Sequence, residues 1–130
     1  MILCMEVNQS ILIIDDISET REGLSKFLTS NGYVVDVASN AKEAIVRIRL
    51  KKYDAAFVDM ILPDMDGVGL MKELNMLSPS TSLILTYDRL SYEQRLRLGA
   101  FAKAGAHFHF LEKPLYEINI LKALEGKSAY

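Results

Sequence analysis

The sequence of 130 residues contains one cysteine, Cys4, so an internal disulfide is excluded and a reducing compartment is expected. It also lacks an excess of either charge. Fifteen Lys and Arg against seventeen Asp and Glu give a formal net charge of −2, which offers no general attraction to nucleic acid or to an anionic membrane. No apolar run approaches the roughly 18 residues of a membrane-spanning helix. The opening residues have no basic start, and Glu6 interrupts them too early for a signal peptide. We therefore expect a soluble cytoplasmic protein.

No internal repeat, low-complexity tract or linker divides the chain. Half of the residues are hydrophobic and a quarter are charged, as in ordinary globular proteins. A chain of this length is near the commonest domain size and is long enough to bury a core. We predict a single domain over residues 1–130. No DNA-binding element follows Tyr130, so we expect no contact of this chain with nucleic acid.

Strand-like and helix-like segments alternate from one end of the chain to the other. Short runs rich in apolar or β-branched residues, typical of strands, lie at 10–14, 33–37, 54–59, 82–86 and 107–111. Apolar residues at helical spacing, with start and stop signals beside them, predict helices at 24–31, 40–48, 70–74, 91–104 and 115–124. Five strands that alternate with five helices predict the α/β class, with a doubly wound, five-stranded parallel sheet.

Acidic residues follow two of the predicted strands at the point where each strand ends. Asp15 and Asp16 follow the apolar run 11–14, and Asp59 follows the run 55–58. In a doubly wound sheet, sites lie at the carboxyl ends of the strands, where Thr86 and Lys113 also fall. Three carboxylates at one edge repel one another unless a proton or a divalent cation neutralises them, and Mg²⁺ takes oxygen ligands. A carboxylate beside Mg²⁺ and a lysine can accept a phosphoryl group.

Each of these residues, taken alone, also has a structural explanation. Asp15 and Asp16 could form a strand-end turn or a helix cap, and Asp59 could be a turn residue. Lys113 alone would be an ordinary surface lysine, and Thr86 at a strand end could reflect β-propensity. Their occurrence together at one edge of the sheet favours a functional site.

Four segments of the chain resemble the receiver domain of two-component response regulators. In chain order they are Ile11–Asp16, Phe57–Gly67, Leu83–Thr86 and Lys113–Pro114. The resemblance covers nearly the whole chain and implies a flavodoxin-like fold of the receiver type. It also implies a phosphorylatable signalling domain, not an enzyme, that accepts a phosphoryl group from a sensor histidine kinase or a histidine phosphotransfer protein and requires Mg²⁺.

The resemblance implies a role for each matching residue around the metal. Asp59 would be the phosphoacceptor, Asp16 a direct Mg²⁺ ligand and Asp15 a ligand through a water molecule. The backbone carbonyl of Ile61, together with Asp59 itself, would complete the protein's share of the coordination. Lys113 would pair first with Asp59 and then with the phosphoryl oxygens.

Two further residues would transmit the signal. By the resemblance, Thr86 would hydrogen-bond a phosphoryl oxygen, and Phe110, three positions before the lysine, would be the aromatic switch residue. A hydroxyl drawn toward the new charge moves its loop and can open a space into which an aromatic side chain turns. In the family, the surface of the fourth helix, fifth strand and fifth helix transmits the output, often through pairing of two receivers. A homodimer through this face is therefore an expected partner.

Two rival functions fit parts of the sequence. A receiver-like scaffold could bind partners without phosphorylation. A haloacid-dehalogenase-type phosphatase would use Asp64, the first residue of an Asp-x-Asp-Gly motif, as its nucleophile. Pro63 precedes Asp64 where a strand is needed, Val68 follows the glycine, and the chain has no room for a cap domain. A calcium loop built on the same motif fails because its first ligand would be Leu62.

Two residues near the predicted site differ from the family pattern. Tyr87 stands where a small residue is usual, so it should narrow access to Asp59, which would slow small phosphodonors or screen the acyl phosphate. Ile61 cannot orient an attacking water as a polar side chain can, although Asp88 could still do so. We predict a comparatively long-lived phosphorylated state.

The interval from Thr86 to Lys113, 113 − 86 = 27 positions, is also unusual. It exceeds the family's usual interval by roughly one helical turn plus a residue. We place the surplus in the fourth helix and the turn after it, and the usual dimer mode would have to accommodate it.

Other polar and sulfur-containing residues are interpreted as structural. His107 and His109 would share one face of a partly exposed strand, and a metal site there would need further ligands that are not evident. The basic run 47–52 predicts a solvated helix face, with a partner surface as the alternative. The methionines at 60, 65, 71 and 76 are predicted to pack in the interior.

Overall fold

The computed structural model describes residues 9–126, which form one parallel sheet of five strands in the order β2-β1-β3-β4-β5. The strands are β1 (Ser10–Ile14), β2 (Val34–Ala38), β3 (Ala55–Asp59), β4 (Ser82–Tyr87) and β5 (Phe108–Glu112). The helices are α1 (Ser18–Ser30), α2 (Ala41–Leu50), α3 (Gly67–Leu77), α4 (Tyr92–Lys103) and α5 (Glu117–Leu124). Cys4, the opening segment and Tyr130 lie outside the described residues.

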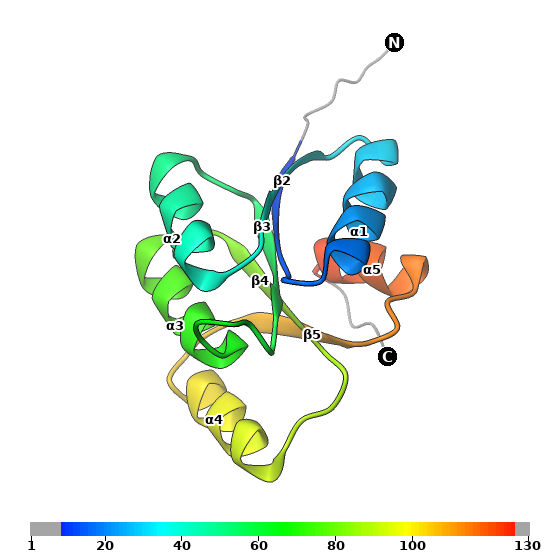
Figure 1. The fold of residues 1–130 in the computed structure, drawn as a ribbon. Coiled ribbons are helices and arrows are strands. Elements are labelled where there is room, and N and C mark those ends of the chain that lie inside the picture. Colours follow the sequence, from blue (N-terminus) through cyan, green and yellow to red (C-terminus); the bar gives the residue numbers. More distant parts are fainter. Residues whose placement is uncertain (1–8, 127–130) are drawn as a thin grey trace.

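Helices cover both faces of the sheet: α2, α3 and α4 lie on one face and α1 and α5 on the other (Figure 1). Each face has its own hydrophobic cluster. Leu12 and Ile14 belong to the cluster on the α2–α4 side, whereas Ile11 and Ile13 belong to the other. This division follows from the strand geometry, because successive side chains point to opposite faces. The predicted α/β class and doubly wound parallel sheet are confirmed. Within residues 9–126, no helix is both long enough and apolar enough to cross a membrane.

The predicted strands and helices are all present. The strand ends differ from the prediction by at most one residue, whereas α1 begins at Ser18, six residues before its predicted start, and α3 extends three residues beyond its predicted range at each end. The prediction that His107 lies on the last strand was wrong, because β5 begins at Phe108, where it pairs with Leu83 of β4. The chain leaves α4 through Gly105, which has a φ of 97° that favours glycine, and His107 still belongs to this connection. His109 is therefore the only one of the two histidines on β5.

The last helix begins at Glu117 rather than at residue 115. Leu115 lies in the turn before it, yet its side chain packs against the hydrophobic cluster on the α1 and α5 side. An apolar residue that packs from a turn imitates the helical spacing in the sequence, which explains the two-residue difference.

Helix α4 begins with a complete side-chain cap and buries few of its residues. The Ser91 side chain accepts the Gln94 N–H, and the Gln94 side chain accepts the Ser91 N–H, which forms a complete capping box. Of its twelve residues only Leu98 and Phe101 are buried. The ring of Phe101 stacks on Phe108 of β5 with 5.5 Å between ring centroids. Helices α1 and α5 also bury only two residues each, so α4 is held by this small apolar contact together with its polar contacts.

Gly67 brings α3 into direct contact with the end of β3. A Cβ atom at this position would lie 2.6 Å from the backbone oxygen of Asp59 and 2.8 Å from the Cα of Met60. Those atoms belong to the backbone and cannot rotate away, so only glycine fits without displacing the helix. The close approach fixes the loop 60–66 next to the carboxyl end of β3.

Candidate functional site

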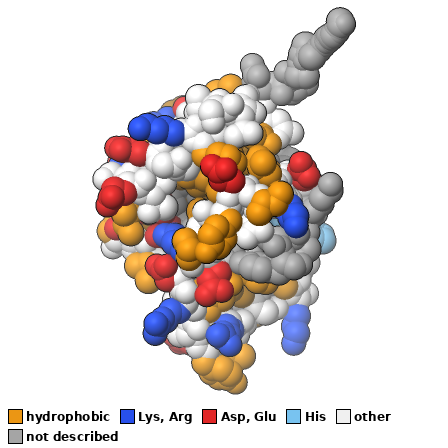
Figure 2. Space-filling view, turned by 90° about the vertical axis from the view of Figure 1, so that its right-hand side faces the viewer, with side chains coloured by type: hydrophobic (Ala, Val, Ile, Leu, Met, Phe, Trp, Pro, Cys, Tyr) orange, Lys and Arg blue, Asp and Glu red, His pale blue; other side chains and the backbone are white. Residues whose placement is uncertain are grey.

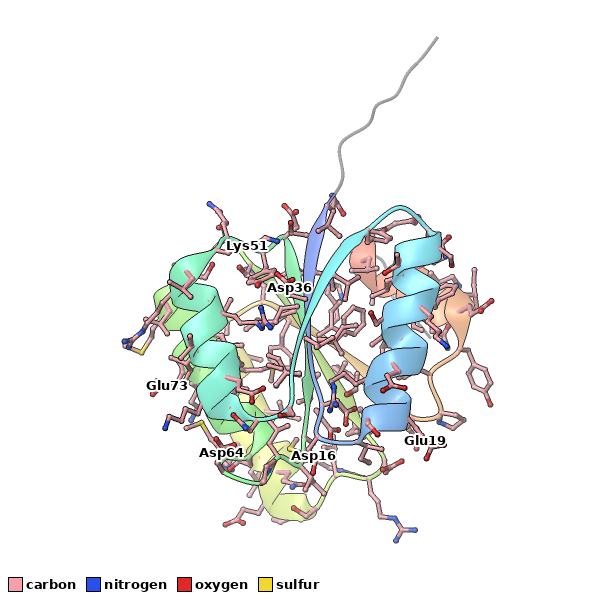
Figure 3. All side chains as sticks on the ribbon, turned by 45° about the horizontal axis from the view of Figure 1, so that its top comes forward. Asp16, Glu19, Asp36, Lys51, Asp64 and Glu73 are labelled. Atoms are coloured by element: carbon pink, nitrogen blue, oxygen red, sulfur yellow. The ribbon has the colours of Figure 1, made fainter. Side chains whose placement is uncertain are left out.

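Three carboxylates meet at the carboxyl ends of β1 and β3. Asp15, Asp16 and Asp59 each offer an oxygen atom, and these atoms all lie within 4.8 Å of one another. Within residues 9–126, no other group of three or more Asp, Glu, His or Cys side chains is placed to share a metal ion. Asp59 is 5% exposed and Asp15 is also buried, whereas Asp16 is exposed at the end of the sheet (Figure 3). The cluster predicted from the sequence is therefore present.

Lys113 contacts two of these carboxylates from its position directly after the edge strand β5. Its Nζ atom lies 3.0 Å from an oxygen of Asp59 and 3.3 Å from an oxygen of Asp15. Lys113 directly follows β5, and its backbone N–H donates to the carbonyl of Tyr87 at 2.7 Å. Because that bond holds the backbone beside β4, the side chain, which is 12% exposed, reaches across β4 to the end of β3.

The electrostatics of the cluster favour the neutralisation of Asp59. Burial raises the pKa of Asp59 to about 6; the hydrogen bond from Lys113 opposes this rise, and the charge of Asp15 adds to it. Burial acts to lower the pKa of Lys113, but its hydrogen bond with Asp59 and the charges of Asp59 and Asp15 outweigh it, so that the pKa lies above its usual value. The lysine thus stays charged, and the site still holds more negative charge than it can balance by itself.

Thr86 lies next to the cluster, whereas Phe110 lies one strand away. Thr86 is buried and pairs in register with Asp59 across β3 and β4. Phe110 is on β5 and its side chain is 49% exposed. The Tyr87 ring contacts Phe110 with 6.3 Å between centroids and an angle of 44° between the planes. Tyr87 therefore lies between the site and the residue that the sequence predicts as its aromatic switch.

Asp16, Asp59 and Lys113 line a pocket of about 290 Å³. Its wall includes Tyr87 and Ile61, the two positions that differ from the family pattern, and also Asp88 and Arg89. Tyr87 thus borders the pocket that contains Asp59, and its effect on access stays a prediction. The Ile61 side chain is exposed at the pocket and contributes no polar group there.

Asp64 is held apart from the cluster at the start of α2. Its two carboxylate oxygens accept the backbone N–H groups of Ala41 at 2.9 Å and Lys42 at 3.0 Å. These bonds, chiefly the one from Ala41, hold the pKa of Asp64 below its usual value. Figure 3 shows Asp64 beside the first turn of α2 and apart from Asp16. A carboxylate that caps a helix in this way has a structural role, so the geometry does not favour a phosphatase that uses Asp64.

The sequence did not predict two features around the site. Asp66 forms an ion pair with Arg97 of α4, and no pattern in the sequence links these two residues. A cavity of about 510 Å³ lies between α1 and α5, with Leu24, Phe27 and Ile120 among its lining residues. Figure 2 shows hydrophobic and acidic side chains together on this face. The hydrophobic residues of α1 could have suggested an apolar surface here, but no pattern in the sequence indicates that α5 forms the other side of the cavity.

The basic run is partly explained by a contact far from the site. Lys51 donates to the carboxylate of Asp36 at 3.2 Å, and the hydroxyl of Tyr53 donates to the same oxygen at 2.7 Å. Figure 3 shows Asp36 and Lys51 at the end of the sheet opposite Asp16. At least one residue of the run therefore belongs to a structural cluster.

Comparison with known proteins agrees with this geometry. The family model of the response regulator receiver domain matches residues 11–125. The chain belongs to the response regulator receiver family. Receiver domains are signalling domains rather than enzymes, and they interact with kinases or phosphotransfer proteins. The acidic cluster of this receiver domain fits the phosphorylation site of the family and is compatible with a divalent metal site.

Two curated relatives show how far the similarity extends. The chemotaxis protein CheY of Thermotoga maritima is 29% identical over 123 residues, which cover 94% of this chain and 99% of CheY. The response regulator MprA of Mycolicibacterium vanbaalenii is 32% identical over 104 residues, which cover 80% of this chain. That match spans only 43% of MprA, so the receiver domain is similar to less than half of this relative.

Two solved structures share the fold. A CheY-like receiver domain protein from Methanospirillum hungatei JF-1 has a TM-score of 0.83 and 27% identity, and the match covers 92% of this chain and 93% of that one. A response regulator from Burkholderia pseudomallei has a TM-score of 0.78 and 27% identity, with 90% and 66% covered. The latter structure contains a phosphorylated aspartic acid, a calcium ion and citrate.

Proposed function

We propose that this receiver domain accepts a phosphoryl group on Asp59 from a sensor histidine kinase or a histidine phosphotransfer protein, with Mg²⁺ bound beside it. The observation on which the proposal rests is the environment of Asp59. It is buried at the carboxyl end of β3, its oxygen lies within 4.8 Å of oxygens of Asp15 and Asp16, and Lys113 is 3.0 Å away. Phosphoryl transfer needs positioning and charge neutralisation more than covalent chemistry, and this environment can supply both.

The donor set suits a hard divalent cation. The carboxylates of Asp16 and Asp59 and the backbone carbonyl of Ile61 would hold Mg²⁺, with Asp15 acting through a water molecule. Burial raises the pKa of Asp59 to about 6, and the charges of Asp15 and Asp16 add to this rise, so the site favours a further positive charge that balances these carboxylates. Bound Mg²⁺ would supply this balance and would also neutralise the phosphoryl oxygens.

Lys113 and Thr86 would act on the phosphoryl group itself. An oxygen of Asp59 forms a bond to phosphorus while the bond from phosphorus to the donor's histidine nitrogen breaks, and the electron pair stays on that nitrogen. The Lys113 ammonium, already in contact with Asp59, can pair with an oxygen of the transferred group. The Thr86 hydroxyl, beside Asp59 in the register of β3 and β4, can donate to another.

The Burkholderia pseudomallei regulator supports this chemistry. Its structure contains a phosphorylated aspartic acid together with a divalent cation, on a fold that superposes on this chain with a TM-score of 0.78. The same fold in this chain places three aspartates at one end of the sheet. The relative therefore supports an aspartyl phosphate, and the presence of a divalent cation, in a protein that shares this fold.

The readout would run from Thr86 to the surface formed by α4, β5 and α5. Phe110 is on β5, is half exposed and is in ring contact with Tyr87, which directly follows Thr86. A shift of Thr86 toward the phosphoryl group would therefore move Tyr87 and change the space beside Phe110. We assign the switch to these residues, and we propose that one outcome is a homodimer through the same surface. We also propose that the domain is cytoplasmic and makes no contact with nucleic acid.

Labelling by a small phosphodonor such as acetyl phosphate tests the proposal. We expect the unmodified protein to be labelled in Mg²⁺ and not in a chelator, Asp59→Asn to be unlabelled, and Asp64→Asn to be labelled normally. Asp64→Asn is a matched control because it makes the same change in a carboxylate that caps α2. Undiminished labelling of Asp59→Asn would remove Asp59 from its role. Partner binding without any labelling would favour the scaffold.

A further inference from the structure

Helix α4 is joined to the start of α3 by an ion pair. Nη1 of Arg97 lies 2.8 Å from Oδ2 of Asp66, and the two side chains are 36% and 41% exposed. The other carboxylate oxygen of Asp66 accepts the N–H of Gly69 at 2.9 Å and so caps α3. Asp66 thus uses one oxygen for its own helix and the other for α4.

Asp66 is also part of the loop that follows the phosphoacceptor. Across this loop it forms an antiparallel bridge with Ile61, whose backbone carbonyl is a proposed metal ligand. The N–H of Gly67 donates to the carbonyl of Met60 at 2.7 Å. The loop 60–66 is therefore closed on itself, and its last residue is the one that Arg97 holds.

These contacts form a short connection from α4 to the metal site. Arg97 contacts Asp66, Asp66 pairs with Ile61, and Ile61 lies two residues after Asp59. The connection is separate from the path through Thr86 and Phe110, because it approaches the site from β3 and α3 rather than from β4 and β5. The connection ends on α4, a helix in which only two side chains are buried.

We propose that Arg97 is a positioning residue for the metal site: its ion pair with Asp66 holds the loop 60–66 in the conformation that presents the Ile61 carbonyl to the cation. This inference rests on the proposed function. Coupling of this kind is reciprocal, so a cation or phosphoryl group at Asp59 also biases the position of α4 through the same pair. The regulation of the site thereby includes a contact that is outside the pocket.

Loss of the pair should weaken the site moderately. Both side chains are more than a third exposed, so solvent screens their attraction and the effect belongs to the range of surface ion pairs. We expect Arg97→Gln to weaken Mg²⁺ binding by about twofold to fivefold. Arg97→Lys, which keeps the charge, should retain most of the affinity, although it loses the planar geometry of the guanidinium.

Mg²⁺ affinity is measured by NMR from the amide shifts of the loop in the full chain. Asp66→Asn is the partner variant, because the Asn oxygen can still accept the Gly69 N–H while the charge is lost. We expect a similar loss in each single variant and no further loss in the double variant, as for two residues that act through one contact. Arg95→Gln is the control: it removes the same charge from an exposed position of α4 for which the structure shows no ion pair among the described residues.

Amide hydrogen exchange provides a second readout that a purely structural role would not change. Binding of beryllofluoride, a mimic of the phosphoryl group, should alter exchange in α4 of the unmodified protein, and Arg97→Gln should reduce that response by about half or more while exchange around Asp59 still responds. Unchanged Mg²⁺ affinity and an unchanged α4 response in Arg97→Gln would overturn the inference, as would additive losses in the double variant. If the unmodified protein itself binds neither Mg²⁺ nor beryllofluoride, the proposed function fails as well.

Discussion

The raised pKa of Asp59 predicts that Asp59→Asn makes the metal-free protein more stable at neutral pH. The carboxyl group has a pKa of about 6 in the folded protein against a usual value of 3.8, so folding favours its protonated form. The difference, 6 − 3.8 = 2.2, corresponds to about 3 kcal/mol. Because the pKa is raised, this contribution to stability is fully present below the unfolded-state value and is lost as the pH rises through about 6.

The Asn side chain is neutral at every pH, as the protonated acid is. The variant therefore does not have the loss of folding stability that the ionised Asp59 causes in the unmodified protein above about pH 6. We expect Asp59→Asn to be more stable by about 1–3 kcal/mol at about pH 7.5, and this advantage to fall by about 1 kcal/mol at about pH 5, where the unmodified protein is largely protonated at Asp59. Mg²⁺ should also reduce the advantage, because the cation stabilises only the chain that binds it well.

Urea unfolding in a chelator, followed by far-UV circular dichroism, measures the effect. Circular dichroism is preferred because the chain contains no tryptophan. Asp64→Asn is the control and should change stability in the opposite direction, since Asp64 accepts two backbone N–H groups at the start of α2 and its pKa is lowered. A less stable Asp59→Asn at neutral pH without Mg²⁺, or an advantage that grows as the pH falls, would refute the electrostatic account of the site.

Three further predictions concern the loop and the pocket. Gly67→Ala should lose about 1–3 kcal/mol of stability in urea and should impair labelling, because its Cβ would meet the backbone of Asp59, whereas Gly99→Ala, which has open space in α4, should not destabilise. A destabilised Gly99→Ala beside an unaffected Gly67→Ala would contradict this. Tyr87→Ala should speed labelling by small phosphodonors, since the ring forms part of the pocket wall, and an unchanged or slower rate would show that the ring does not limit access. Ile61→Asn should shorten the lifetime of the phosphorylated state by supplying a side chain that can orient water; decay within seconds in the unmodified protein, followed by slower decay in the variant, would show the reverse.

The fold was predictable because it depends on local patterns. The apolar runs of β1 and β3 are buried on both faces of the sheet, and their residues alternate between the two hydrophobic clusters as strand geometry requires. The cap of α4 was also predictable, because Ser91 and Gln94 are three residues apart and form the box within one helical turn. The start of β5, next to His107, could not be predicted, because the pairing of β5 with β4 determines where the strand begins.

The residues of the site were predictable for a different reason. In a doubly wound sheet the carboxyl ends of parallel strands come together, so the sequence alone predicts that Asp15, Asp16 and Asp59 lie close to one another. Lys113 was placed near them by the same rule and contacts Asp59 as expected. The roles of these residues in phosphoryl transfer remain predictions that labelling can test.

Sequence alone thus determined the order of elements, the family and the edge of the sheet where the acidic residues gather, because each depends on short-range pattern and on the rules of parallel sheets. Only the tertiary structure decided how those residues behave. The pKa of Asp59 depends on its burial, which the packing of α3 and the neighbouring strands sets. Asp64 and Asp66 lie in one short motif, yet one caps α2 and the other pairs with α4. Contacts between residues 23 and 31 positions apart arise from how helices pack on the sheet, and no local pattern records them.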